Sequence, residues 1–171
     1  MKNLRQYIRN ILNEAMVKAN QLPEDVTVVI QDIDGDSSQF SIYYKTTRFS
    51  FPLGEIKIGR QENCDGAMKV IEVYSDLENG GPLRYDLALE LATLHANGLT
   101  PDRGYVSWSA RQVWDYYYNN RSDVKSTPLS PELCPAVYNI ADWQASPMSK
   151  RYTKSPTTIQ QLRSLKKLEM L

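Results

Sequence analysis

Residues 76–83 form the segment whose residue types best suit a ligand site. Gly80 and Gly81 precede Pro82, between an apolar run typical of a strand and a leucine-rich run typical of a helix. Glycines let a backbone approach a ligand closely, and amides at the start of a helix can bind phosphate. The segment therefore suits a pyrophosphate, although two glycines before a helix also make an ordinary tight turn.

Aromatic residues are concentrated over residues 108–118. They are Trp108, Trp114, Tyr116, Tyr117 and Tyr118. Aromatic side chains on a helix usually belong to the core, but three consecutive tyrosines cannot all face inward. At least one hydroxyl should reach solvent or a cleft, where a tyrosine can act as a general acid.

The alternating acids Asp32, Asp34 and Asp36 have the residue type of calcium ligands. A calcium loop needs a glycine after the third acid and a glutamate at its twelfth position, which is Tyr43 here. Because the spacing fails, a hairpin turn is the favoured interpretation.

The remaining reactive side chains are few. His95 is the single histidine, and Cys64 and Cys134 are the two cysteines. They are too few and too far apart for a zinc site, and two cysteines do not make a disulfide framework. A mechanism based on histidine would have to use His95, which lies late on an apolar helix, where a partly buried structural residue is more typical. We expect both cysteines to be small packing residues in a protein made in a reducing compartment.

The hydrophobic pattern predicts helices and strands in a mixed order. Helical spacing of apolar residues marks residues 4–20, 82–97 and 107–120, and a last helix beginning near residue 157. Strand-type patterns mark residues 26–30, 40–47, 55–60 and 68–74, with a short strand near residue 99. On the second helix one face should carry Leu83, Leu87, Leu91 and Leu94, and on the last helix one face should carry Ile159, Leu162, Leu165 and Leu168.

The composition is that of one globular domain. The chain has 171 residues, of which 42% are hydrophobic, and its net charge is zero. No apolar run reaches the length of about 18 residues that a membrane span requires, and the N-terminus lacks the apolar block of a secretory signal. Basic residues are in excess at both ends and acidic residues in excess over residues 24–90. Basic ends beside an acidic body explain this more simply than a nucleic-acid surface does.

Several strings resemble a family of uncharacterised tailed-bacteriophage proteins over roughly residues 68–171. The strings are GGPLRYD at 80–86, GLTPDR at 98–103, VWDYY at 113–117, NRSDV at 120–124 and SPMSK at 146–150. That family in turn resembles GNAT-type N-acyltransferases in its order of strand, loop, helix, strand and helix. The resemblance implies an α/β (α+β) fold, in which a mixed and largely antiparallel sheet is flanked by helices.

The same resemblance implies a site for acetyl-coenzyme A. In such enzymes, backbone amides of the loop after the long strand bind the pyrophosphate. Carried over, the cofactor-binding residues are Asn79, Gly80, Gly81, Leu83 and Arg84.

The enzymes also commonly have asparagine, alanine and an acid tyrosine in the next helix. Here those positions hold Ser107, Ala110 and Trp114, and Tyr117 follows one turn later as the candidate catalytic acid. The loop departs from the pattern too, at Glu78 and Leu83.

The N-terminal string MKNLRQYIRNILNEA resembles the capsid-targeting leader of proteins packed inside the heads of T-even-like phages. Their head maturation protease cuts after leucine or isoleucine, any residue, then glutamate. The processing residues would be Leu12, Glu14 and Ala15, with cleavage after Glu14. A plain first helix packed on the domain is the alternative.

These observations predict three parts: residues 1–22 as an N-terminal helix and leader, residues 23–125 as a GNAT-like domain, and residues 126–171 as a proline-punctuated extension ending in a packed helix.

The favoured function is a virion-associated phage protein that keeps the fold without the chemistry, located in the phage head or the host cytoplasm. Its partners would be head proteins or a host protein, with no membrane and no nucleic acid. The alternative is an active N-acetyltransferase that moves an acetyl group from acetyl-coenzyme A to an amine.

Overall fold

The structure is a computed structural model that describes residues 19–74, 82–135, 137 and 145–171. Its elements, in chain order, are η1 (Ala19–Gln21), β1 (Val26–Asp32), β2 (Gln39–Thr46), β3 (Glu55–Arg60), β4 (Met68–Tyr74), α2 (Pro82–His95), β5 (Leu99–Thr100), α3 (Trp108–Asn120), β6 (Val124–Pro128), η2 (Pro147–Ser149), β7 (Lys150–Lys154), α4 (Thr157–Ser164) and β8 (Leu168–Met170). The expected helix at residues 4–20 lies largely outside the described residues, and η1 is the part of it that the structure describes.

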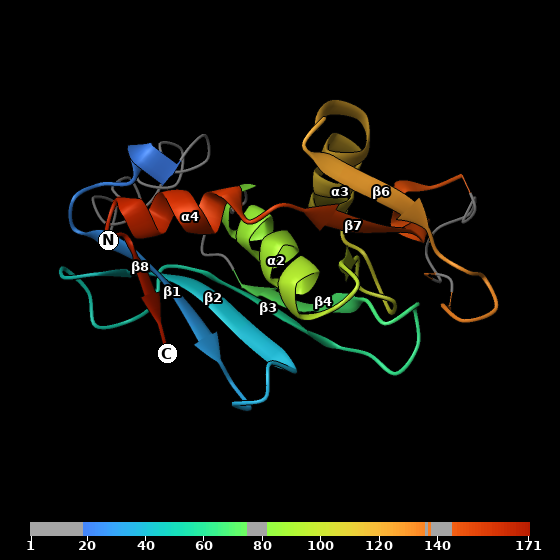
Figure 1. Cartoon of the computed structure of the whole chain (residues 1–171), viewed down its shortest axis with the longest axis horizontal. Coiled ribbons are helices and arrows are strands. Elements are labelled where there is room, and N and C mark those ends of the chain that lie inside the picture. The colour runs from blue at the N-terminus through green and yellow to red at the C-terminus, as the bar shows by residue number, and fades with distance from the viewer. Residues whose placement is uncertain (1–18, 75–81, 136, 138–144) are drawn as a thin grey trace.

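The strands form one mixed sheet in the order β6-β7-β5-β4-β3-β2-β1-β8. Strands β1 to β4 are joined as an antiparallel meander, whereas β4 pairs with β5 and β1 pairs with β8 in parallel. Figure 1 shows α2 and α4 above strands β1 to β4, with α3 beside β6 and β7. The expected fold class, a mixed and largely antiparallel sheet flanked by helices, is confirmed.

The sheet crosses the boundary expected between residues 125 and 126. Strand β6 spans that position, and β7 lies in the interior of the sheet between β5 and β6. After β7 the chain returns along α2 as α4 and adds β8 beside β1. The proline-punctuated segment therefore supplies an interior strand and an edge strand.

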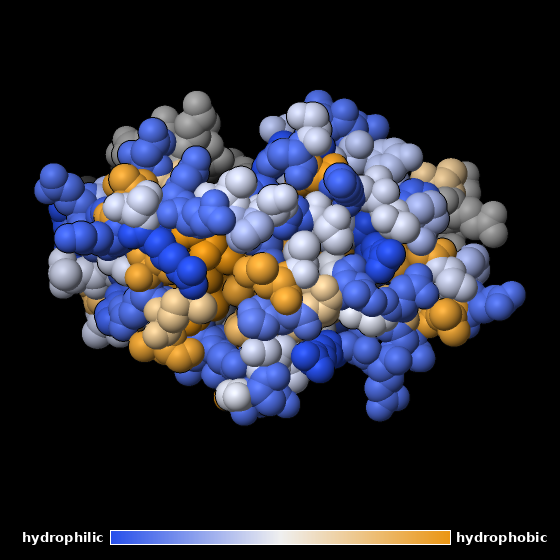
Figure 2. All heavy atoms as spheres, viewed as in Figure 1, coloured by the Kyte–Doolittle hydropathy of each residue, from blue (hydrophilic) through white to orange (hydrophobic). Residues whose placement is uncertain are grey.

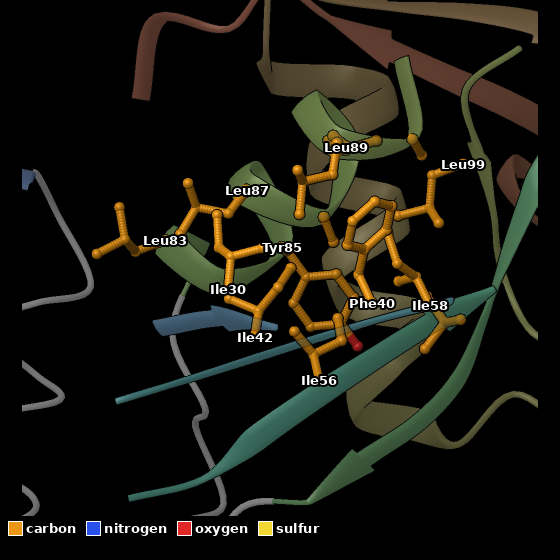
Figure 3. Close-up of a cluster of buried hydrophobic side chains, with 14 of the residues drawn as sticks. Ile30, Phe40, Ile42, Ile56, Ile58, Leu83, Tyr85, Leu87, Leu89 and Leu99 are labelled. Atoms are coloured by element: carbon orange, nitrogen blue, oxygen red, sulfur yellow. The ribbon is translucent and has the colours of Figure 1, made fainter. Parts of the chain in front are cut away.

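Helix α2 is the centre of the molecule. Leu83, Leu87 and Leu91 are buried as expected, but all the residues between them except Asp86 are buried as well, since α2 contacts the sheet, β7 and α4. Figure 3 shows leucines of α2 packed against isoleucines of the sheet, with Tyr85 and Phe40 between them. A helix covered on most of its sides belongs to a core, and the charged residues of α2 therefore need partners within the fold. The expectation for Leu94 was wrong, because this residue lies where the helix emerges and is 54% exposed.

The last helix is shorter than expected. Ile159 and Leu162 are buried, but α4 ends at Ser164, Leu165 is exposed, and Leu168 belongs to β8. Lys166 adopts a positive φ of 53°, which turns the chain from helix to strand. In Figure 2 hydrophobic side chains gather on one face where α4, α2 and β8 meet.

The three acids of the β1–β2 connection form a turn, as expected. Asp32 accepts hydrogen bonds from the backbone of Gly35 and Ser37, at 3.0 and 2.9 Å. Asp36 accepts one from the backbone of Ser38. Because these carboxylates hold the hairpin together, the calcium-like spacing has a structural explanation, and no metal-binding group of acids, histidines or cysteines is found within the described residues.

Candidate functional site

The parallel strands β4 and β5 part soon after they begin. Their pairing is Met68 with Leu99 and Lys69 with Thr100, after which β5 ends and β4 continues to Tyr74. Opposite β3, the register shifts by one residue, so that Ile71 is an extra residue in β4. A β-bulge of this kind bends its strand. In the described residues, the side of β4 that faces β5 therefore has no strand partner beyond Lys69.

This opening is the place where the fold could receive an extended ligand. Ile71 and Val73 of β4 are both substantially exposed. Unpaired backbone groups of a strand can pair with an extended chain or with the amides of a ligand arm.

Of the loop that the resemblance assigns to the pyrophosphate, the structure describes only the last part, from Pro82 onward. Asn79, Gly80 and Gly81 lie outside the described residues, and α2 begins at Pro82. Leu83 is buried and belongs to the hydrophobic core. Its side chain therefore packs in the core and does not face a ligand.

Arg84 stands in the first turn of α2, but its side chain lies in the core. Its side chain is 1% exposed, its guanidinium lies 5.3 Å above the ring of Tyr44, and burial lowers its pKa. A Cβ added at Gly54 would lie 2.5 Å from Arg84 Nη1, so the glycine makes room for this cation. A side chain so deeply buried is not available to a phosphate at the surface, although the resemblance implies that role for Arg84.

Tyr117 is buried and already donates its proton in a hydrogen bond. Its hydroxyl donates to Asp86 Oδ1 at 2.7 Å, and its side chain is 1% exposed. Burial, followed by the nearby Asp86 carboxylate, raises the pKa of Tyr117 well above its ordinary value. A general acid must lie within hydrogen-bond distance of the group that it protonates. Here the hydroxyl of Tyr117 donates to the side chain of Asp86, so its proton is directed at the protein and not at a ligand.

Arg121 completes a charged network around the same carboxylate. It makes two hydrogen bonds to Asp86, at 3.0 and 3.1 Å, and two more to Asp123, both at 2.8 Å. Its guanidinium also lies 5.2 Å from the centre of the Tyr117 ring. The network joins α2, the end of α3 and the start of β6, so its first effect is to position these elements.

The two departures from the acyltransferase pattern have structural roles. Ser107 caps α3 by accepting a hydrogen bond from the backbone of Ala110 at 3.3 Å. Trp114 is buried, with its ring against Tyr85, Tyr117 and Tyr152. An indole here fills the space between α2, α3 and β7.

The other aromatic residues follow the helical geometry. As expected, the three tyrosines of α3 do not all face inward, since Tyr116 and Tyr118 are exposed. His95 is exposed at the end of α2, with its ring 5.0 Å from that of Phe40.

Sequence reasoning missed a buried ion pair between α2 and β7. Lys154 contacts Glu90 within the core, and the two side chains are 3% and 0% exposed. Glu90 also accepts hydrogen bonds from the backbone of Thr158 and Ile159, both at 2.8 Å. Because α4 has no capping side chain of its own, Glu90 serves as its cap from another helix. Nothing in the sequence separates this glutamate from those of a solvated helix face.

The cysteines are joined, which corrects the expectation of two separate packing residues. Cys64, between β3 and β4, forms a disulfide with Cys134, in the connection after β6. Both are buried and form a small cluster with Leu129. Seventy residues separate the two along the chain, so only the fold brings them together.

The remaining sequence predictions fall outside what the structure describes. Leu12, Glu14 and Ala15 are not among the described residues. Comparisons with protein-family models, curated proteins and solved structures gave no match. Among the described residues, no helix has the length and apolar character needed to cross a membrane.

Proposed function

We propose that this chain is a virion-associated bacteriophage protein that keeps an acyltransferase-like fold without catalysing acyl transfer. The resemblance of its strings to tailed-phage proteins supports the phage assignment. The observation that carries the absence of catalysis is the Tyr117 hydroxyl, which is buried and donates to Asp86 at 2.7 Å. To protonate a departing thiolate, Tyr117 would have to break a charge-assisted hydrogen bond and reach solvent.

The arrangement of the neighbouring residues supports the same proposal. Trp114 occupies the position at which the acyltransferase pattern has its tyrosine, and Arg84 is committed to the core. Partners would then be phage head proteins or a host protein, in the phage head or the host cytoplasm. No nucleic-acid or membrane partner is needed.

Processing of the leader tests the virion assignment. We expect the chain recovered from purified virions to begin at Ala15, while the chain expressed alone in the host keeps residues 1–14. Intact-mass measurement of both samples decides this. Glu14→Gln should block cleavage, and the matched change Asn13→Gln should not. A full-length chain in virions would contradict cleavage, and absence from virions would contradict the assignment itself.

An N-acetyltransferase is the second candidate, and one observation favours it. Strands β4 and β5 part after Lys69 and Thr100, next to a bulge at Ile71, and this leaves backbone groups of β4 open. If coenzyme A were bound, it would supply an activated thioester there, and β4 would hold its extended arm.

Calorimetric titration with acetyl-coenzyme A separates the two candidates. We expect binding to be absent or no tighter than about millimolar. The side chain of Arg84 is buried and cannot contact the phosphates, so only backbone amides would be left to bind them. Micromolar binding that Val73→Glu abolishes, and that the remote Lys45→Ala preserves, would contradict the non-catalytic proposal and favour the enzyme.

A further inference from the structure

The disulfide lies where two connections between strands meet. Cys64 belongs to the turn from β3 to β4, and Cys134 belongs to a turn that follows β6. Hydrogen bonds also join these segments. The backbone of Cys64 donates to the carbonyl of Leu133 at 3.1 Å, and the backbone of Ser130 donates to Asp65 Oδ2 at 3.4 Å. The disulfide is therefore the main link between the two turns.

The turn that contains Cys64 is held in an unfavourable conformation. Cys64, Asp65 and Gly66 have φ values of 65°, 58° and 72° in succession. Residues other than glycine rarely adopt this left-handed region, and they stay in it only when surrounding contacts fix them. Asn97 supplies one such contact by donating to the carbonyl of Asp65 at 2.8 Å. Loss of the disulfide would remove the strongest remaining constraint.

A buried cation lies beside one sulfur of the pair. Arg103 Nη1 is 3.6 Å from Cys134 Sγ, and its Nη2 donates to the carbonyl of Met148 at 2.8 Å. Arg103 is only 8% exposed, and this burial lowers its pKa to about 10. A thiolate next to a desolvated arginine is stabilised, and a stabilised thiolate is the better leaving group in thiol–disulfide exchange.

We propose that Cys64 and Cys134 form a redox-sensitive clamp, in which Arg103 favours Cys134 as the leaving thiolate and reduction releases residues 129–135 from the β3–β4 turn. The reductant is a dithiol. Its first thiolate attacks Cys64 Sγ, the Cys64–Cys134 bond breaks, and Cys134 leaves with the electron pair beside Arg103.

The second thiol of the reductant completes the exchange. It loses its proton to solvent and attacks the reductant's own sulfur in the mixed disulfide. Cys64 departs as a thiolate and takes up a proton from water. The dithiol is thereby oxidised to a disulfide, and the protein gains two electrons. Since both protein sulfurs are buried, the segment must open before the attack, so reduction should become independent of dithiol concentration at high concentration.

Hydrogen exchange of the full chain tests the clamp. Oxidised and dithiothreitol-reduced protein are compared by mass spectrometry over residues 61–67 and 129–135, with the β1–β2 hairpin as internal reference. We expect exchange in both turns to rise by about tenfold or more on reduction while the hairpin stays unchanged. The variant Cys64→Ser/Cys134→Ser should show the reduced pattern without reductant.

The role of Arg103 has its own readout. In glutathione buffers, Arg103→Met should shift the equilibrium toward the disulfide by about tenfold, the effect of one pKa unit, and Arg103→Lys should keep most of the native value. Circular dichroism verifies that each variant is folded. Unchanged exchange on reduction, unfolding of the whole chain on reduction, or two free thiols after incubation with oxidised glutathione would each overturn the clamp. An equilibrium unaffected by Arg103→Met would overturn the assignment of the leaving sulfur.

Discussion

Two acidic residues on α2, one helical turn apart, have different roles. Glu90 is fully buried, contacts Lys154 and caps α4 through the backbone of Thr158 and Ile159. Asp86 is partly exposed and contacts Tyr117 and Arg121, which itself extends to the exposed Asp123. Both carboxylates join α2 to later parts of the chain, but Asp86 is itself partly exposed, whereas Glu90 is not.

The difference shows how burial decides the energetic weight of an ion pair. A buried charge that loses its partner has no solvent to replace it, whereas an exposed charge does. Loss of the Glu90 ion pair should therefore lower the free energy of unfolding most. Within the Asp86 network, the loss should be larger for the buried tyrosine than for the exposed aspartate. Three substitutions test this order.

Glu90→Gln should have the largest effect. It leaves the ammonium of Lys154 buried without a counter-charge, so we expect the free energy of unfolding to fall by about 3–5 kcal/mol. Chemical denaturation measures the change. The exposed Glu62→Gln, as matched control, should change it by less than about 0.5 kcal/mol. A small effect of Glu90→Gln would mean that water reaches Lys154, and the contrast would fail.

Tyr117→Phe should have an intermediate effect. The substitution keeps the ring in the core and removes one hydrogen bond to a carboxylate, which costs about 1.5–3 kcal/mol. Thermal or chemical unfolding gives the value, with the exposed Tyr118→Phe as control. Because the hydroxyl is proposed to be structural, any acetyl-coenzyme A binding should be the same in both variants. Selective loss of a transferase activity in Tyr117→Phe would restore this residue as an acid.

Asp123→Asn should have the smallest effect, below about 1 kcal/mol, because Asp123 is largely exposed. Hydrogen bonding by Arg121 lowers the pKa of Asp123 below its ordinary value of 3.8. The stabilisation is therefore complete above pH 3.8 and is lost as the pH falls through the lower pKa of the folded state. Unfolding curves of wild type and Asp123→Asn should differ at pH 6 and converge as the pH falls below the pKa of Asp123 in the folded state. A constant difference would show that the ion pair is not its source.

The first half of the sheet could be predicted from the sequence because its strands are apolar and β-branched. The predicted ranges 55–60 and 68–74 coincide with β3 and β4. Strand β7 was missed because its inward positions are Lys150, Tyr152 and Lys154, the reverse of the usual pattern. Lysines can face a core only when the rest of the fold supplies partners, and a local pattern does not contain that information.

The candidate site was predictable to a smaller extent. The cap of α3 at Ser107 follows from local chemistry. The inward side chain of Arg84 depends on Gly54 and Tyr44, which lie about thirty and forty residues earlier. Only the fold brings these residues next to Arg84. The same holds for the bond between Cys64 and Cys134.

The pairing of β1 with β8 also has a consequence for synthesis. Val28 donates to the carbonyl of Lys167 and Leu171 donates to that of Ile30, both at 2.9 Å, so an early strand is completed by a very late one. On the ribosome, β1 must stay an open edge until every other described element has been translated, a matter of many seconds at about 5–20 residues per second. Contacts so distant along the chain slow folding. Until they form, the nascent protein exposes an unpaired edge strand that can pair with other chains. We therefore expect this pairing to be among the late steps of folding, and a crowded cell to make it the step most in need of a chaperone.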